Sequence, residues 1–446
     1  MKIVVIGGGP VGLVSGSVLA NVGHEVHLVE IDEARAASVA RGVPPFHEPG
    51  LDAMLQHVVG SGRLRVTRDV RAVAADAEAI LICVGTPATG HGADLSALRA
   101  ASRDLGMALR GSAGYRAVAV KSTVPPGTTT DIVEPILREH SGLGADALGV
   151  GMNPEFLREG VAVEDMRTPD RVVLGVRDDR TRERLAAVYA PFDAPLVFTT
   201  PTGAEMAKYT SNALLSTLVS FSNEIAALCE GTDGADADEV LRAVHADRRF
   251  RGPVGQNGPA SIVSYLLAGL GYGGSCFPKD TEALVMWARE REMSTPILDA
   301  VRKVNDERPE RVLALLKSRI DLDGAEVAVL GLAFKPETDD LRESRSLDLV
   351  RLLNDAGARV RACDPVAAEQ GALVLGQSAV VTTDAEVALR GADAAVLATA
   401  WPQFIRLDPG KVRSLMRRPL VLDARRALDR VAWSKHCEYL PIGAKA

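Results

Sequence analysis

The sequence lacks an excess of basic residues, and it has no apolar run of membrane-spanning length. Its 58 acidic residues outnumber its 51 lysines and arginines, which gives a formal net charge of −7 at pH 7. A general nucleic-acid-binding protein needs a basic surface to neutralise phosphates, so the charge argues against that function. It still allows a local basic pocket for one diphosphate. Because a transmembrane helix needs about 20 consecutive apolar residues, we expect no contact with a membrane.

Cysteines are few, and nothing in their spacing indicates a disulfide framework or a metal site. They are odd in number and widely separated, and no CxxC or Cys/His pattern is present. The chain begins MKIVVIGGG and enters a glycine loop without the charged start or the cleavage site of a secretory signal peptide. These features predict a cytoplasmic protein without a metal ion. The five cysteines are Cys83, Cys229, Cys276, Cys363 and Cys437.

Hydrophobic patterns divide the 446 residues into two α/β parts with a helical part between them. A chain of this length exceeds what one core supports, so two or three domains are expected. In the first 150 residues short β-branched runs alternate with helical patterns, which predicts a doubly wound parallel sheet. A helical pattern almost free of Gly and Pro covers residues 203–230, and another helix begins near Pro278. The predicted strands are residues 2–7, 25–30, 79–84, 117–121, 326–331, 359–364 and 393–399.

A GxGxxG pattern follows the first predicted strand and opens a helix. Gly7 permits the tight turn, Gly9 lets the backbone approach a pyrophosphate, and Gly12 lets helix and strand pack closely. Glu30 ends the second strand at roughly the twenty-residue offset of a ribose-binding acid. A carboxylate there accepts from a 2′-hydroxyl and repels a 2′-phosphate, so NAD is preferred over NADP. Asp32 is the less favoured candidate for this role.

Cys276 differs from the other cysteines because glycines and charges surround it. It precedes Pro278 by two residues, and proline is well tolerated in a first helical turn. The helix dipole, together with Lys279, would favour the thiolate, which is the nucleophilic form. Asp280 lies four residues later and returns to the same face if the turn is helical. The other four cysteines are interpreted as small buried apolar residues.

Three further segments carry polar groups suited to catalysis, and each also has a structural interpretation. Lys208 and Asn212 are four residues apart on the long helix, where they either stabilise an oxyanion together or lie on a solvated face. The segment 153–160, NPEFLREG, offers two carboxylates or is a surface turn. The segment 121–128, KSTVPPGT, follows a strand and offers hydroxyl and backbone N–H groups.

Eight segments, taken in their order along the chain, make the sequence similar to the UDP-glucose/GDP-mannose dehydrogenase family. They are spread along most of the chain and read GGGPVGL, PPFHEPGL, CVGTP, KSTVPPGT, NPEFLREG, EMAKYTSNALLSTLVSFSNE, GYGGSCFPKD and GLAFKPETDDLRESRS. The resemblance implies two Rossmann-like doubly wound domains joined by a helical central domain with a long connecting helix. It implies an NAD-binding domain over residues 1–200, a helical dimerisation domain over 201–305, and a sugar-nucleotide-binding domain over 306–446. A homodimer formed through the central domain is expected.

The same resemblance implies the site residues and a nucleotide-sugar substrate. Cys276 would be the nucleophile, with Lys208, Asn212 and Asp280 polarising the reacting carbon and a water. Thr123 and Glu159 match positions near the reacting carbon and the nicotinamide, with Glu159 a candidate acid or base. The implied NAD contacts are Gly7, Gly9, Val11, Gly12, Glu30, Arg35, Thr86, Thr123, Glu159, Lys279 and Arg342. The implied substrate contacts are Glu155, Phe156, Leu157, Arg158, Glu159, Lys208, Asn212, Tyr265, Leu266, Leu267, Ala268, Gly269, Gly273 and Lys335.

The implied reaction converts a primary alcohol into an acid by two hydride transfers to NAD. An aldehyde is a poor hydride donor until a nucleophile adds to it, so a thiol addition to the aldehyde makes the second oxidation feasible. The resulting thioester is then hydrolysed. A sugar-nucleotide-binding protein without catalysis would not need Cys276, Lys208 or Asp280, and a single-step reductase would not need the thiol.

The choice of sugar nucleotide stays open between UDP-glucose and relatives such as GDP-mannose or a UDP-N-acetylhexosamine. Phe277, the Lys279–Asp280 pair and the CDP sequence at 363–365 resemble the UDP-glucose branch. That branch normally carries Arg-Ile-Gly before the Tyr265–Gly269 loop, and this chain has Ala260-Ser261-Ile262 there. Either an upstream arginine reaches the substrate through a longer loop, or the substrate differs. The upstream arginines are Arg248, Arg249 and Arg251.

Overall fold

The computed structural model describes residues 1–89, 92–250 and 261–445 and divides the chain into two compact units. Unit 1 contains Met1–Ser211 and Glu282–Arg291, and unit 2 contains Asn212–Thr281 and Glu292–Ala446.

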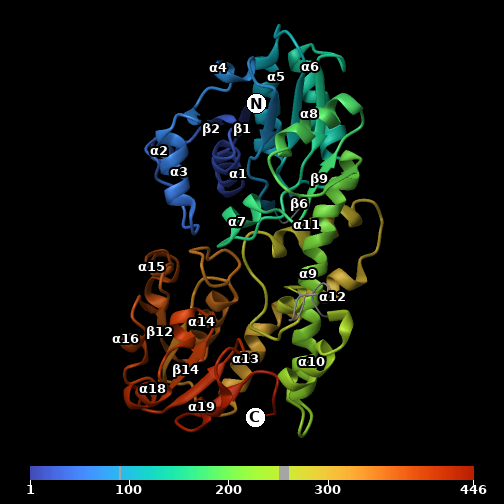
Figure 1. The fold of residues 1–446 in the computed structure, drawn as a ribbon. Helices are drawn as coiled ribbons and strands as arrows, with labels where there is room; N and C mark the ends of the chain where they lie inside the picture. Colours follow the sequence, from blue (N-terminus) through green and yellow to red (C-terminus); the bar gives the residue numbers. More distant parts are fainter. Residues whose placement is uncertain (90–91, 251–260, 446) are drawn as a thin grey trace. The chain divides into compact units, whose positions relative to one another are not determined.

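Unit 1 is built on an eight-stranded sheet in the order β10-β9-β8-β7-β4-β1-β2-β3. Strands β1, β2 and β9 of this sheet are labelled in Figure 1. The run from β3 to β8 is parallel and has the strand order of a dinucleotide-binding fold. Strand β9 is antiparallel to β8, and β10 is parallel to β9. The strands are β1 (Lys2–Ile6), β2 (Glu25–Val29), β3 (Leu64–Thr67), β4 (Ala79–Ile82), β7 (Arg116–Val120), β8 (Leu148–Met152), β9 (Val172–Gly175) and β10 (Leu196–Thr199), with a separate hairpin β5 (Ala88–Thr89) and β6 (Gly92–Ala93).

Helices cover both faces of this sheet because its strands are apolar on both sides. In β1, Ile3 and Val5 belong to one core, whereas Val4 and Ile6 belong to the core on the other face. Side chains of α1, α3 and α7 fill the first core, and side chains of α5 and α6 fill the second. The helices are α1 (Pro10–Asn21), α2 (Glu33–Ala40), α3 (Leu51–Gly60), α4 (Arg71–Ala74), α5 (Ser96–Leu109), the π-helical turn η1 (Thr129–Val133), α6 (Glu134–Ser141), α7 (Ala162–Arg167) and α8 (Asp179–Tyr189).

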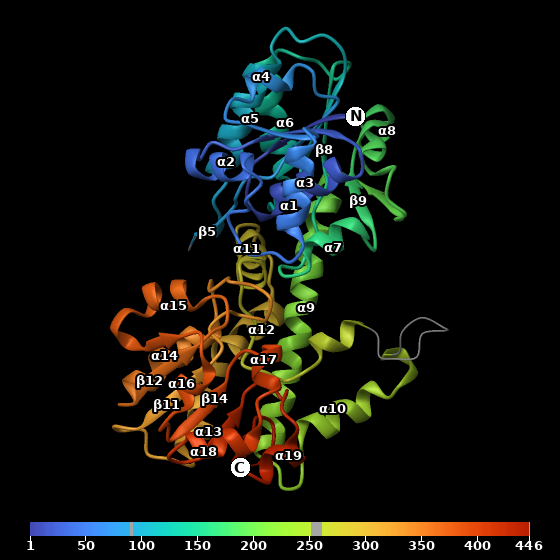
Figure 2. The ribbon, with the colours of Figure 1, turned by 60° about the vertical axis from the view of Figure 1, so that its left-hand side comes forward.

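Unit 2 contains a second parallel sheet, in the order β13-β12-β11-β14-β15-β16. Its central strands β12, β11 and β14 are labelled in Figure 2. This order repeats that of the first parallel sheet, so the predicted fold of two Rossmann-like domains with a helical region between them is confirmed. Its strands are β11 (Glu326–Leu330), β12 (Arg359–Cys363), β13 (Val380–Thr382), β14 (Ala394–Leu397), β15 (Leu420–Asp423) and β16 (Glu438–Pro441). Its helices include α14 (Arg345–Asp355), α15 (Ala368–Leu375), α16 (Ala385–Leu389), α17 (Pro402–Ile405), α18 (Pro409–Leu415) and α19 (Arg430–Ser434).

Between the two sheets the sequence is mainly helical. The long helix α9 (Pro201–Glu230) contributes residues to both units. It is followed by α10 (Ala237–His245), the 3₁₀ turns η2 (Arg248–Phe250) and η3 (Ser261–Tyr265), α11 (Phe277–Arg289), α12 (Pro296–Asp306) and α13 (Arg308–Lys317). In the part of the chain that the structure describes, no helix has both the length and the apolar character needed to cross a membrane.

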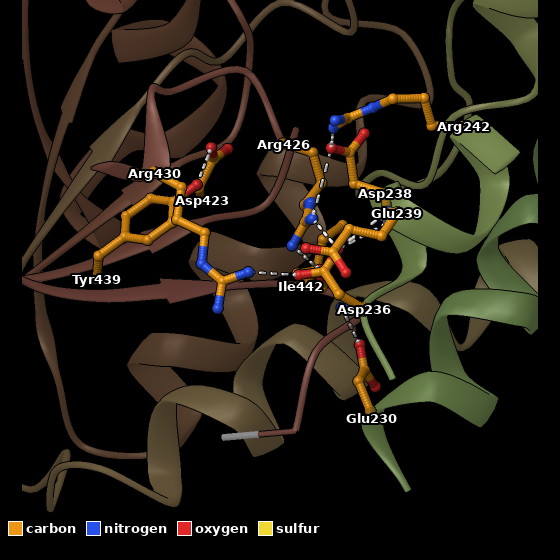
Figure 3. A network of polar contacts seen from close by, with 11 residues as sticks. Glu230, Asp236, Asp238, Glu239, Arg242, Asp423, Arg426, Arg430, Tyr439 and Ile442 are labelled. Atoms are coloured by element: carbon orange, nitrogen blue, oxygen red, sulfur yellow. Dashed lines mark hydrogen bonds and ion pairs between the residues drawn. The ribbon is translucent and has the colours of Figure 1, made fainter. Parts of the chain in front are cut away.

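In unit 2, a buried ionic network ties the start of α10 to the C-terminal strand (Figure 3). Asp236 is the N-cap of α10 and accepts hydrogen bonds from the backbone N–H groups of Asp238 and Glu239. Its carboxylate also pairs with the guanidinium groups of Arg426 and Arg430. Arg426 in turn donates to the carbonyl of Ile442, so the network joins segments about 200 residues apart.

Replacing Asp236 with Asn is expected to lower the free energy of unfolding by about 3 kcal/mol, because the largely buried Arg426 would lose its close carboxylate and keep only Asp238, at 3.9 Å. Burial alone would raise the pKa of Asp236, but the hydrogen bond and charge of Arg426 outweigh it and hold that pKa below its usual value. The stabilisation is therefore present above the unfolded-state pKa of about 4 and is lost as the pH falls further. Chemical denaturation at several pH values measures both effects.

The control is Asp233→Asn, since Asp233 is 86 % exposed and pairs with Lys445 at the surface. This change should alter stability by less than about 0.5 kcal/mol. Equal losses in the two variants would show that the Asp236 network does not stabilise the fold.

Candidate active site

The glycine loop between β1 and α1 has the geometry needed to bind a dinucleotide. A Cβ on Gly12 would lie 1.9 Å from the carbonyl oxygen of Gly7, so a side chain there would collide with the turn. A Cβ on Gly9 would have no atom within 4 Å, which leaves the backbone open where a diphosphate would approach. Val11 lies in the first turn of α1. The loop therefore fits the diphosphate of NAD at a helix N-terminus.

Glu30 lies directly after β2, and its carboxylate is fixed by hydrogen bonds. It is 4 % exposed and accepts from the N–H groups of Gly8 at 3.0 Å and Asp32 at 2.8 Å. The guanidinium of Arg35 lies 3.1 Å from the same carboxylate. Asp32 has a different role, because its side chain caps α2 by accepting from the Arg35 N–H. The geometry thus favours Glu30 over Asp32 as the ribose-binding acid.

Thr86 and Thr123 come together at the carboxyl ends of β4 and β7. The Thr86 hydroxyl donates to the Thr123 carbonyl at 2.7 Å, and the Ser122 hydroxyl donates to the Val84 carbonyl at 2.6 Å. These bonds join the CVGTP and KSTVPPGT segments, which sequence reasoning identified separately. Both segments lie at the edge of the sheet where ligands bind in this fold.

Lys208 forms a buried ion pair with Glu155, the first carboxylate of the NPEFLREG loop. The Lys208 Nζ and the Glu155 Oε1 are 3.0 Å apart, and the two side chains are 4 % and 6 % exposed. Burial raises the pKa of Glu155, but the charge and hydrogen bond of Lys208 more than offset this and leave that pKa below its usual value. The alternatives of a solvated helix face and a surface turn are therefore wrong for these two residues.

The rest of this loop is held by several contacts. Phe156 packs against the guanidinium of Arg171, 4.0 Å from the ring centre, and Lys208 Nζ lies 5.5 Å from the same ring. The Leu157 N–H donates to Glu155 at 2.6 Å. Arg158 pairs with Asp165 at 2.6 Å, and Glu159 follows it in a partly buried position. All five residues from 155 to 159 thus belong to one braced loop in unit 1.

Cys276 in unit 2 immediately precedes α11, as the position of Pro278 predicted. The Asp280 N–H donates to the Cys276 carbonyl at 2.8 Å, which starts the helix at the thiol. The Ser275 hydroxyl lies 3.6 Å from the sulfur. Cys276 is the one cysteine of the five that is partly exposed, and burial raises the pKa of both Cys83 and Cys363 to about 12. The interpretation of the other four as buried apolar residues is confirmed.

Asn212 and Asp280 also meet in unit 2. The Asn212 side-chain N–H donates to Asp280 at 2.6 Å, and the Asp280 carboxylate also pairs with Lys279. Asn212 and Asp280 are 5 % and 1 % exposed. An amide has two N–H bonds and Asp280 accepts one, so the pair can fix the direction in which the other points.

The glycine-rich loop before Cys276 is anchored through its backbone. Gly269 donates to the side chain of Asn223 at 2.8 Å, and its carbonyl accepts from Arg308 at 3.0 Å. A Cβ on Gly273 would lie 2.3 Å from the carbonyl oxygen of Glu343, so glycine is required there. The remaining predicted substrate and cofactor contacts of unit 2 have the following surroundings. The ring of Tyr265 is 6.2 Å from that of Phe277, Leu266 and Ala268 are buried, and Leu267 is half-exposed. Lys335 lies beside the Phe334 ring, and Arg342 pairs with Asp340.

The segment before the Tyr265–Gly269 loop, where this chain departs from the UDP-glucose branch, lies only partly within the described residues. Arg248 and Arg249 form η2, and Arg249 pairs with Asp247 at 3.0 Å. Arg251 lies outside the described residues, as does the segment to residue 260. Within the described residues, no cluster of three His, Cys, Asp or Glu side chains could hold a metal ion.

Sequence reasoning missed the partners that hold these groups. Glu155 was expected to bind substrate, and nothing in the sequence paired it with Lys208, 53 positions away. It also did not single out Glu48 and Glu205, two buried carboxylates that accept hydrogen bonds from loop backbones. Their burial, which only the structure shows, is the signal that identifies them, because carboxylates are almost never buried without partners.

Comparisons with known proteins cover nearly the whole chain. Residues 1–193 match the NAD-binding domain of the UDP-glucose/GDP-mannose dehydrogenase family, residues 202–307 its central domain, and residues 328–430 its UDP-binding domain. The UDP-glucose 6-dehydrogenase AglM of Haloferax volcanii is 42 % identical over 96 % of this chain and 98 % of its own length. The UDP-glucose 6-dehydrogenase of Rhizobium meliloti is 42 % identical over 99 % of both chains. A solved UDP-glucose dehydrogenase from Pyrobaculum islandicum superposes with a TM-score of 0.90 and 38 % identity, covering 100 % of this chain and 98 % of its own.

Proposed function

Since the chain belongs to the UDP-glucose/GDP-mannose dehydrogenase family, whose NAD-binding domain it contains, we propose that it oxidises UDP-glucose to UDP-glucuronate through a thioester on Cys276. The observation that carries this proposal is the setting of the thiol. Cys276 is the partly exposed cysteine, and it immediately precedes α11. Asp280, in the first turn of α11, is buried and accepts a hydrogen bond from Asn212 of α9. The full-length relatives at 42 % identity support UDP-glucose as the sugar nucleotide.

The proposed reaction consumes the alcohol, two NAD⁺ and one water, and it yields the carboxylate, two NADH and three protons. NAD supplies the hydride acceptor for both oxidations. The Cys276 thiolate adds to the aldehyde carbon and forms a thiohemiacetal, whose carbon can lose a second hydride. Water then adds to the thioester carbonyl, the C–S bond breaks, and the thiolate is regenerated with release of the acid.

The charged and amide groups have separate roles in this scheme. Lys208 and Asn212 would stabilise the oxygen that becomes negative when the thiolate or water adds to the carbon. Asp280 would orient Asn212 and assist the hydrolytic water, and Thr123 and Glu159 would hold and move protons at the alcohol and the water. Glu155 would keep Lys208 in place through their 3.0 Å ion pair.

The cofactor and the substrate have distinct proposed contacts. NAD would be held by Gly7, Gly9, Val11, Gly12, Glu30, Arg35, Thr86, Lys279 and Arg342. The nucleotide sugar would contact residues 155–159, Lys208, Asn212, residues 265–269, Gly273 and Lys335.

A panel of nucleotide sugars tests the substrate. NADH formation should have its highest kcat/KM with UDP-glucose, above that with GDP-mannose or a UDP-N-acetylhexosamine. A higher kcat/KM with one of the others would show that the substrate is a different nucleotide sugar, as the departure from the UDP-glucose branch at residues 248–260 allows. No NADH with any sugar would support a protein that only binds sugar nucleotides.

A homodimer formed through α9 is supported by an apolar stripe on that helix. Leu214, Phe221 and Leu228 are 52 %, 53 % and 62 % exposed and recur every seven residues. Residues seven apart lie on one face of a helix and fill one of the two positions per heptad that form the seam between two packed helices. A second copy of the chain presents the same surface. Symmetric pairing of one surface with its own copy is the commonest way for soluble oligomers to form.

Replacing Phe221 with Glu is expected to convert the dimer into monomers, because two carboxylates would be buried at the seam. Light scattering coupled to size-exclusion chromatography measures the mass. The control is Leu373→Glu, a change at an 81 % exposed apolar residue of α15. A Phe221→Glu protein that stays dimeric, or a wild-type monomer, would contradict the proposed interface.

The location and the domain boundaries also remain proposals. Five free cysteines support a reducing compartment such as the cytoplasm. The family segments support a division into residues 1–200, 201–305 and 306–446.

A further inference from the structure

Two buried carboxylates in unit 1 share one arrangement, in which one oxygen accepts a hydrogen bond from a loop N–H and the other from the first N–H of the helix that follows that loop. Glu48 lies between α2 and α3, and Glu205 lies in the second turn of α9. They are 3 % and 0 % exposed. A carboxylate so deeply buried is costly unless charge-assisted hydrogen bonds compensate it. Backbone N–H groups offset part of that cost here, although burial still leaves the pKa of Glu205 above its usual value.

Glu48 braces the backbone on the far side of Glu159. Its two oxygens accept from the N–H groups of Gly160 at 2.8 Å and Ala162 at 2.7 Å. Gly160 has a φ of +79°, a left-handed conformation that a side chain rarely adopts. On the near side, the N–H of Arg158 donates to Asp165 at 2.9 Å. The backbone is therefore fixed on both sides of Glu159.

Glu205 braces the loop that carries Thr123. Its oxygens accept from the N–H groups of Gly127 at 2.6 Å and Thr129 at 2.7 Å. The indole N–H of Trp287 holds the same loop by donating to the Pro126 carbonyl at 3.1 Å. Glu205 precedes Lys208 by three residues on α9, so this carboxylate ties the Thr123 loop to the helix that carries Lys208.

We propose that Glu48 and Glu205 are positioning residues for the oxidation, acting through Glu159 and Thr123 respectively. The inference rests on the proposed function, in which those two residues move protons at the reacting groups. Neither carboxylate needs to touch the substrate. Proton transfer requires the donor and acceptor within hydrogen-bond reach, and a displacement of about 1 Å can cost 100-fold in rate.

The test compares Glu48→Gln and Glu205→Gln with Glu78→Gln. Glutamine keeps the size of glutamate but replaces one acceptor oxygen by an NH₂ group, which cannot accept a hydrogen bond. Glu78 is the control because it also accepts a backbone N–H, from Lys2 at 2.8 Å, but its side chain is 41 % exposed and it lies before β4 at the opposite ends of the strands. We expect kcat to fall by at least about tenfold in the first two variants, with KM for both substrates within about threefold, and no change in Glu78→Gln.

Two further readouts separate positioning from loss of structure. The melting temperature should fall modestly in Glu48→Gln and Glu205→Gln, because each change leaves a buried backbone N–H without its acceptor, and should stay at the wild-type value in Glu78→Gln. The rate of Cys276 alkylation by iodoacetamide should remain close to the wild-type value in all three variants. If Glu48→Gln fails to fold, Glu205→Gln carries the same test in a different segment. Unchanged kcat, an equal fall in Glu78→Gln, or a rise in KM alone would overturn the inference. A wild-type enzyme that forms no NADH would instead overturn the proposed function.

Discussion

Cys276→Ala is expected to lower kcat for complete oxidation to the acid by at least about 10⁴-fold, as removal of a covalent nucleophile does in other enzymes. Without the thiol, the aldehyde carbon has no group that adds to it and makes it a hydride donor. The variant should still bind NAD and the nucleotide sugar, because the glycine loop and the buried ion pair of unit 1 are untouched. Initial rates of formation of the acid and the equilibrium binding of both ligands measure these two expectations.

Cys276→Ser gives a second view of the same step. A serine can form an ester, but an alkoxide is a poorer leaving group than a thiolate, so the acyl-enzyme should accumulate and appear in the intact mass. Cys437→Ala is the matched control, since Cys437 is buried and burial raises the pKa of its thiol. Full activity in Cys276→Ala, or equal losses in the control, would contradict the role of Cys276.

Lys208→Met is expected to lower kcat/KM by about 10³-fold, the upper range for the loss of one group that stabilises an oxyanion. The change also leaves Glu155 buried without its cation, which should cost about 3 kcal/mol of stability. With the charge of Lys208 absent, burial dominates and the pKa of Glu155 moves upward, so the variant should be less destabilised at acidic pH than at neutral pH. Steady-state kinetics and denaturation at several pH values measure these effects.

The double variant Lys208→Met, Glu155→Gln separates catalysis from folding. Replacing both charges removes the unpaired carboxylate, so most of the lost stability should return while the activity does not. If activity returned with stability, Lys208 would serve the fold alone.

Local sequence patterns were sufficient for the elements that begin each Rossmann-like domain. β1 and the glycine loop were predicted because a β-branched run, a tight turn and a helix start occupy consecutive residues. The same is true of β11 and β12, and of α9, whose sequence contains almost no Gly or Pro. The position of Cys276 at a helix start also followed from a local signal, Pro278.

Contacts between distant segments could not be predicted from those patterns. Glu48 meets Gly160 across 112 residues, and Asp236 meets Arg430 across 194 residues. Neither pair shares a motif, so only the folded chain brings them together. The strands β8 and β9 were not predicted from the sequence, so their antiparallel pairing was missed as well.

The resemblance supplied the roles that spacing could not. Lys208 and Asn212 are four residues apart, which predicts a shared face and nothing about their partners. In the structure, Lys208 pairs with Glu155 and Asn212 with Asp280. The catalytic roles of all four residues stay predictions until the variants are measured.

The stoichiometry of NADH tests the central claim most directly. Purified wild-type protein, a limiting known amount of UDP-glucose and excess NAD should yield two NADH for each UDP-glucuronate, with no free aldehyde in solution. The second hydride can be released in place only if the aldehyde stays bound as the Cys276 adduct. One NADH for each sugar consumed, with an aldehyde as the product, would contradict the four-electron mechanism.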